Sequence, residues 1–145
     1  MTDADGNAAR PVLLDTDVFS KVYVPTAKDA IGVAWAGVLA GRTVAIAVQT
    51  EVELRAWPRL NNWSEKRAAA LDARITAVPR IPANELVQAA YIDLTVWAKQ
   101  EGHGIQAGIH VADRWIAATA MAYGLELAAI DAIYDGVANL SLLKP

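Results

Sequence analysis

The sequence predicts a single α/β domain in which a central parallel β-sheet is flanked by α-helices. Apolar runs typical of strands buried on both faces occur at 12–14 and 44–48, and a third, interrupted only by Glu126, occurs at 125–130. Longer segments with helical periodicity separate these runs. The chain has 145 residues, of which 54% are hydrophobic, and this is enough to bury one core. We therefore expect one domain over 11–145, preceded by a polar, acidic and loose leader over 1–10.

Residues that favour helix ends mark the elements between the strands. Thr26 and Asp29 can cap a first helix, Asn84 can cap a later one, and Gly102 and Gly124 follow helix ends. In chain order the expected elements are a strand at 12–14, a helix at 26–40, a strand at 44–48, a helix from 50 that breaks at Pro58, a helix at 64–75, an extended stretch at 78, helices at 84–102 and 113–123, and strands at 125–130 and 140–143.

Composition limits the function classes. The chain lacks cysteine, which excludes disulfides and thiol nucleophiles and suits the reducing cytoplasm in which we expect the protein to act. No signal-peptide pattern is visible at the first residues. The longest uncharged apolar run, 30–41, is too short for a bilayer, which needs about 20 residues, so no membrane association is expected. The formal net charge is −3, so any nucleic-acid contact must come from a local basic surface.

Acidic residues fall where the carboxyl ends of the strands are expected. Asp15 follows the first strand, Glu53 lies shortly after the second, and Asp131 follows the third. Asp113 opens the helix that leads into the third strand. Because parallel strands end at one edge of a sheet, these four side chains are expected to converge there.

Such a cluster needs either protonation of some of its acids or a divalent cation among them. Two carboxylates about 5 Å apart repel by roughly 3 kcal/mol at an effective dielectric constant of 20. All-oxygen ligands favour Mg²⁺ or Mn²⁺, and the absence of cysteine, with only two histidines, argues against zinc. A bound divalent ion can activate water and stabilise the leaving oxygen of a phosphodiester.

Each acid also has a purely structural interpretation. Asp15 can pair with a lysine, Asp113 can favour a helix N-terminus, and Asp131 can belong to a polar turn. Glu53 can complete a capping box with Thr50, in which case it does not face the site.

The local sequences around these acids resemble the PIN-domain family, in particular the VapC-type toxins of toxin–antitoxin systems. The segments that carry the resemblance span nearly the whole chain from residue 12 and are 13–18, 49–55, 112–120 and 127–131 with Tyr134. The segment 112–120, Ala-Asp-Arg-Trp-Ile-Ala-Ala-Thr-Ala, is the most specific of them.

The resemblance implies a PIN-like sandwich, Mg²⁺- or Mn²⁺-dependent cleavage of RNA, a homodimer and a cognate VapB-like antitoxin. It assigns the metal and the catalysis to Asp15, Glu53, Asp113 and Asp131, with Thr119 as a supporting polar residue. Two positions depart from the family pattern. Ala129 stands where a hydroxyl residue is common, and Ile133 stands where a further acid is common. Asp17 or Asp135 can compensate for these losses.

Basic and aromatic residues suggest where RNA would lie. Arg55, Arg59 and Arg114 are the candidate phosphate contacts, although a solvated helix face is an equally good interpretation of such a cluster. The tryptophans can stack on bases or belong to the core or a dimer interface; they are Trp57, Trp63 and Trp115.

Two other functions fit parts of the sequence. Asp15-Thr16-Asp17 is similar to the Asp-x-Asp signature of haloacid-dehalogenase-like phosphatases, in which Asp15 would be the nucleophile. That family needs a downstream lysine, for which Lys99 and Lys144 are poor candidates. The other alternative is a non-catalytic PIN-like module that only binds RNA or a partner; such a module would not need all four acids.

Overall fold

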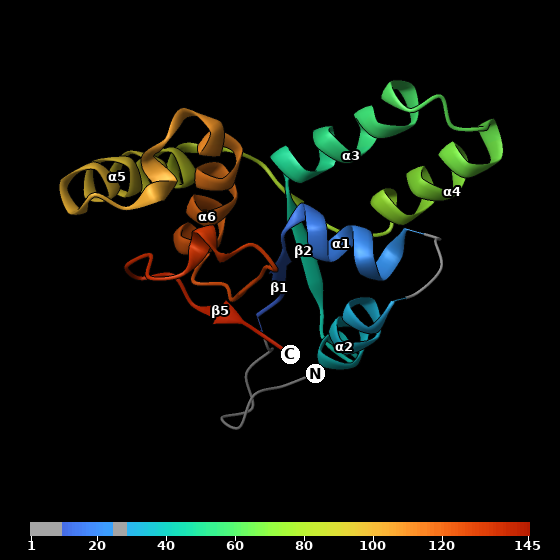
Figure 1. The fold of residues 1–145 in the computed structure, drawn as a ribbon, viewed down its shortest axis with the longest axis horizontal. Coiled ribbons are helices and arrows are strands. Elements are labelled where there is room, and N and C mark those ends of the chain that lie inside the picture. Colours follow the sequence, from blue (N-terminus) through green and yellow to red (C-terminus); the bar gives the residue numbers. More distant parts are fainter. Residues whose placement is uncertain (1–9, 25–28) are drawn as a thin grey trace.

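Five short parallel strands form one sheet in the order β3-β2-β1-β4-β5. The structure is a computed structural model that describes residues 10–24 and 29–145 (Figure 1). The strands are β1 (Val12–Leu14), β2 (Val44–Ala47), β3 (Arg80–Ile81), β4 (Leu127–Ala128) and β5 (Leu142–Leu143). The helices are α1 (Thr16–Tyr23), α2 (Ala30–Leu39), α3 (Val48–Leu60), α4 (Glu65–Thr76), α5 (Glu85–Glu101) and α6 (Val111–Tyr123), with short 3-10 turns η1 (Gly104–Gln106), η2 (Gly108–His110) and η3 (Ala132–Tyr134). The predicted α/β class is confirmed.

Strand β1 is the central strand of the sheet and separates the core into two layers. Its three side chains are fully buried, and Leu13 pairs in register with Ala45 of β2 and Leu127 of β4. Successive side chains of a strand point to opposite faces. Leu13 accordingly packs with residues of α5 and α6, whereas Val12 and Leu14 pack with residues of α1, α2, α3 and α4. Figure 1 shows these two groups of helices on opposite sides of the strands.

Helix α1 is the element that the sequence analysis did not predict. It begins directly after β1, and Asp15 is its N-cap: the Asp15 side chain accepts a hydrogen bond from the backbone N–H of Asp17. Its buried residues are Thr16, Val18 and Phe19. The turn from β1 into α1 therefore fixes Asp15 at the carboxyl edge of the sheet.

Two helix starts differ from the prediction. Helix α2 begins at Ala30 with Asp29 as its N-cap, and Thr26 lies outside the described residues. Helix α3 begins at Val48, two residues before Thr50, with Ala47 at the N-cap position and no side-chain cap. The predicted capping box of Thr50 and Glu53 is therefore wrong, because Thr50 is already inside the helix.

The other helices follow the prediction closely. Ser64 caps α4, Asn84 caps α5, and left-handed Gly102 and Gly124 end α5 and α6. Helix α3 continues through its last turn at Pro58 instead of breaking there. The third predicted strand is shortened to the two residues of β4. Over the described ranges, no helix combines the length and the apolar character needed to cross a bilayer.

Candidate acidic site

A hollow of about 210 Å³ lies at the carboxyl edge of the sheet, and carboxylates dominate its lining. Its walls are Asp15, Thr16, Asp17, Glu53, Ile109, Ala112, Asp113, Ile116 and Asp131. The fold thus brings the four predicted acids to one hollow, although the sequence separations between them are 38, 60 and 18 residues. Asp17 is the fifth acid there, whereas Asp135 does not line the hollow.

Asp15 is the most buried of these acids, with an exposed fraction of 4%. Its Oδ1 accepts the backbone N–H of Asp17 at 2.8 Å, and its Oδ2 accepts the phenolic hydroxyl of Tyr134 at 2.6 Å. Burial raises the pKa of Asp15 to about 6, against the lowering effect of these two hydrogen bonds. Charge on this carboxyl is therefore costly, as expected at a site built for a cation.

Asp113 lies in the first turn of α6 and has both oxygens in contact with neighbours. Its Oδ1 is 3.1 Å from the Tyr134 hydroxyl, and its Oδ2 is 2.7 Å from Nδ1 of His110. Nδ1 of His110 must carry a proton in this contact, because the carboxylate can only accept. The sequence analysis assigned neither Tyr134 nor His110 to the site. The i, i+3 spacing of His110 and Asp113 at a helix start was the one available signal.

Glu53 reaches the hollow from the second turn of α3. The hydroxyl of Thr16 donates to Oε2 of Glu53 at 2.9 Å and also lies 3.2 Å from the hydroxyl of Thr50. The contact joins α1 to α3. Glu51, two residues earlier, instead forms ion pairs with Arg55 and Arg80.

The last two acids are more exposed. Asp131 is the N-cap of η3, where its Oδ1 accepts the backbone N–H of Ile133 at 2.9 Å. Partial burial and the charges of Asp131 and Asp113 raise the pKa of Asp17. These acids repel one another across the hollow.

The chemistry of this site fits a divalent cation. Within the described residues, no Lys or Arg nitrogen lies within 4.0 Å of any of the five carboxylates. A set of carboxylate oxygen donors around one hollow, none of them in an ion pair with a described Lys or Arg, is the ligand type that Mg²⁺ and Mn²⁺ prefer. In the same described part of the chain, no three of these side chains stand close enough together to enclose an ion. The exposed side chains of Glu53 and Asp131 would have to move for three donors to surround one ion.

Solved structures share this arrangement of strands and helices. FitAcB from Neisseria gonorrhoeae superposes with a TM-score of 0.73 at 28% identity, over 92% of this chain and 96% of that one. VapBC2 from Rickettsia felis, solved bound to a DNA fragment from the promoter, gives a TM-score of 0.73 at 20% identity, over 92% and 98% of the two chains. VapBC-5 from Mycobacterium tuberculosis, a member of the VapBC family of toxin–antitoxin systems, gives 0.65 at 23% identity, over 93% and 98%.

The chain has the fold of a VapBC-type protein. The resemblance predicted from the sequence is thereby confirmed at the level of the fold. No protein-family model and no curated protein sequence matches the chain. The functional assignment must therefore depend on the site.

Arg114 and Thr119 are placed inside this VapBC-type fold and away from the hollow. The Arg114 guanidinium is buried and donates to the carbonyl oxygens of Ile105 and Ala107 and to the hydroxyl of Tyr91. Thr119 is fully buried, and its hydroxyl donates to the carbonyl oxygen of Trp115. The assignment of Arg114 to phosphate contact is therefore corrected to a structural role, and Thr119 supports α6 and not the acids directly.

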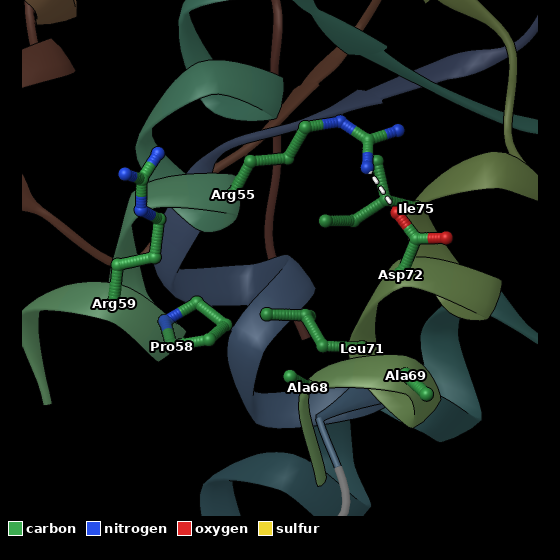
Figure 2. Close-up of a pocket in the computed structure, with 8 residues that line it drawn as sticks. All are labelled: Arg55, Pro58, Arg59, Ala68, Ala69, Leu71, Asp72 and Ile75. Carbon is green, nitrogen blue, oxygen red and sulfur yellow. Dashed lines mark hydrogen bonds and ion pairs between the residues drawn. The ribbon is translucent and has the colours of Figure 1, made fainter. Parts of the chain in front are cut away.

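The two other predicted phosphate contacts line a cleft of about 480 Å³ between α3 and α4 (Figure 2). Figure 2 shows Arg55 reaching from α3 to Asp72 of α4, and Arg55 also pairs with Glu51. Arg59 extends from the next turn of α3, and no described carboxylate lies within 4.0 Å of its guanidinium. Of the two arginines, Arg59 has the charge that a phosphate could use.

The aromatic and histidine side chains have structural contacts. Trp57 and Trp63 pack against the core layer on the α1–α4 side, and Trp115 stacks on Tyr91 with ring centroids 4.0 Å apart. Nδ1 of His103 accepts the backbone N–H of Ile105, so Nε2 donates to the carbonyl oxygen of Asp135 at 2.7 Å. His103 therefore ties η1 to the loop after η3.

Proposed function

We propose that the chain is a metal-dependent endoribonuclease and the toxin of a VapBC-like toxin–antitoxin pair. The observation that supports this most is the convergence of five carboxylates, uncompensated by any described Lys or Arg, on one hollow of a VapBC-type fold. The reaction is hydrolysis of an RNA phosphodiester.

In this proposal Asp15, Glu53, Asp113 and Asp131 hold Mg²⁺ or Mn²⁺, and Asp17 supports them by adding negative charge. The bound cation supplies a Lewis acid that lowers the pKa of water and stabilises the leaving oxygen. The protein fixes Asp15 in advance by its N-cap hydrogen bond and Tyr134, whereas the exposed Glu53 would leave Thr16 to join it. Such pre-organisation reduces the reorganisation needed during reaction.

Arg59 is the proposed phosphate contact of the RNA substrate. Arg59 lies on the same helix as Glu53, six residues further along, so an RNA strand at the acidic hollow would have to follow α3 to contact it. Arg55 contributes less, because Glu51 and Asp72 already neutralise its charge.

The proposed partners are a small VapB-like antitoxin and a second copy of the chain. The five carboxylates of the hollow would attract an arginine from an antitoxin segment, which would cover the site and block RNA. Solved structures with this fold include a toxin–antitoxin complex from Klebsiella pneumoniae, which supports a protein partner. We propose that the protein acts in the cytoplasm, where its RNA substrate is found.

The phosphatase alternative lacks its lysine. Within the described residues, no lysine nitrogen lies within 4.0 Å of Asp15, and Lys144 donates to the carbonyl oxygen of Ala129. These contacts favour the nuclease.

The test is RNA cleavage by the purified protein with Mg²⁺ or Mn²⁺, with and without EDTA. We expect cleavage that EDTA stops and that excess Mn²⁺ restores. Undiminished cleavage in EDTA would exclude the metal mechanism. Retained RNA binding without any cleavage, in a protein that also tolerates loss of all four acids, would instead identify a non-catalytic binding module.

A further inference from the structure

Tyr134 is a fully buried residue whose hydroxyl lies between two of the acids. The phenolic oxygen is 2.6 Å from Oδ2 of Asp15 and 3.1 Å from Oδ1 of Asp113. Tyr134 lies on η3, Asp15 joins β1 to α1, and Asp113 lies in α6. One hydroxyl thus connects three elements that are far apart in the sequence.

The Tyr134 hydroxyl is the donor that Asp15 and Asp113 share. The second oxygen of Asp15 accepts the N–H of Asp17, and the second oxygen of Asp113 faces His110. Each carboxyl group therefore has its own anchor on one side, and they share Tyr134 on the other. In the part of the chain that the structure describes, no other side chain bonds to both.

We infer that Tyr134 is a positioning residue whose hydroxyl sets the separation and orientation of Asp15 and Asp113 for a divalent cation. The inference rests on the proposed function, because it assumes that these acids hold the metal. A phenol has one proton, so it can donate to only one of the two carboxylates at a time. When both acids are ionised, one of the two carboxylates therefore has no hydrogen bond from Tyr134, and a cation beside them would balance its charge.

The position of Tyr134 also bears on the two departures from the family pattern. The hydroxyl missing at Ala129 is not replaced beside Asp131, whose carboxyl is held by the N–H of Ile133. The Tyr134 hydroxyl, five residues later in the chain, serves Asp15 and Asp113 and not Asp131. The side-chain hydroxyl of the site therefore orients a different pair of ligands.

The experiment compares Tyr134→Phe with the wild type and with Tyr123→Phe. Phe keeps the ring that fills the core and removes only the hydroxyl. The Tyr123 hydroxyl contacts Asn84 and does not line the acidic hollow, so Tyr123→Phe is a matched loss of one phenolic oxygen. By calorimetry, Tyr134→Phe should weaken Mn²⁺ binding about 10- to 100-fold, the usual effect of losing a partner that orients a ligand. Tyr123→Phe should leave the affinity unchanged.

A second, metal-free measurement tests the contact itself. Melting temperatures in EDTA of Tyr134→Phe, Asp113→Asn and the double variant should not be additive, since directly coupled residues deviate from additivity. Additive effects, unchanged Mn²⁺ affinity in Tyr134→Phe, or a wild type that binds no Mn²⁺ would each overturn the inference. RNA cleavage is scored separately. Lack of cleavage in a protein with the expected Mn²⁺ difference would reject the nuclease and support the positioning role.

Discussion

Oε2 of Glu51 lies 2.6 Å from Nε of Arg80, so the first of the two glutamates on α3 is paired at the start of β3 and does not face the acidic site. Glu53 is two residues later, about 200° further round the helix. There it accepts the Thr16 hydroxyl and lines the hollow. Two neighbouring glutamates therefore have opposite roles, which a pair of conservative variants can separate.

Glu53→Gln should abolish metal-dependent cleavage, because a neutral amide oxygen holds a divalent cation far less well than a carboxylate. Glu51→Gln should leave cleavage within a few fold and reduce stability by roughly 1 kcal/mol or less, since its ion pairs are partly exposed. Cleavage assays and melting curves on both variants check this. If Glu51→Gln abolished cleavage and Glu53→Gln did not, the assignment of Glu53 would be wrong and Glu51 would be the ligand from α3.

Three of the acids could be predicted from the sequence because they lie at or shortly after a strand end, where a parallel sheet brings its ligands together; Asp113 was predicted from its place at the start of the helix before the last of these strands. The orientation of each acid could not be predicted from the sequence. Asp15 caps a helix that was not predicted. Glu53 does not form the alternative capping box with Thr50, because α3 already starts at Val48. Both depend on how the backbone leaves a strand, which apolar periodicity does not encode.

The supporting residues were harder to predict than the acids. Tyr134 reaches the site across 119 and 21 residues of sequence, so no local pattern indicates its two contacts. Arg114 was predicted to contact RNA, whereas tertiary packing buries it. Side-chain burial depends on the assembled core, and this is why the sequence analysis misplaced it.

Asp113→Asn should remove activity while the protein stays folded. The substitution keeps the volume and removes one charge from a crowded site. Cleavage should therefore fall by more than the roughly 10- to 100-fold that losing a supporting partner of a metal site costs. Melting temperature should be unchanged or raised. Asp93→Asn, on the exposed side of α5, is the control and should keep wild-type cleavage. Full activity in a folded Asp113→Asn protein would remove Asp113 from the ligand set.

The raised pKa of Asp15 predicts how stability depends on pH in the absence of metal. Its folded-state pKa of about 6 lies above the ordinary value of 3.8, so the unfolded chain loses this proton first as pH rises. The contribution of Asp15 to the free energy of unfolding should therefore be highest below about pH 4 and should fall between pH 4 and 6. The total loss is roughly 3 kcal/mol.

Melting curves in EDTA from pH 4 to pH 8 measure this decline. Asp15→Asn should flatten it and retain the helix cap, because Asn caps as well as Asp. Asp29→Asn is the matched control, since Asp29 also caps a helix but has its pKa lowered by Lys21. That variant should leave the decline in place. An equal slope in Asp15→Asn and the wild type would show that Asp15 is not the group responsible.

Arg59 and Arg55 should differ in their effect on RNA binding. Arg59→Gln should weaken binding to single-stranded RNA and reduce the slope of log affinity against log salt by about 0.7, the value for one lost phosphate contact. Arg55→Gln should change binding less, since its charge is already paired with Glu51 and Asp72. Titrations in EDTA at several salt concentrations give both slopes. Equal slopes for Arg59→Gln and the wild type would place the RNA elsewhere.

Replacing Arg114 should reduce stability and leave RNA binding unchanged, whereas replacing Arg59 should affect RNA binding. The Arg114 guanidinium donates to the Ile105 carbonyl at 2.5 Å and to the Ala107 carbonyl at 3.0 Å, and so holds the loop between α5 and α6. Arg114→Gln cannot span these acceptors and leaves the buried Ile105 carbonyl without its donor, so it should cost about 2–4 kcal/mol. For a domain of this size the melting temperature should fall by roughly 5–15 °C. RNA titrations at a temperature where the variant is folded should give the wild-type salt slope. A stable Arg114→Gln protein with a reduced slope would instead return Arg114 to the RNA-contacting surface.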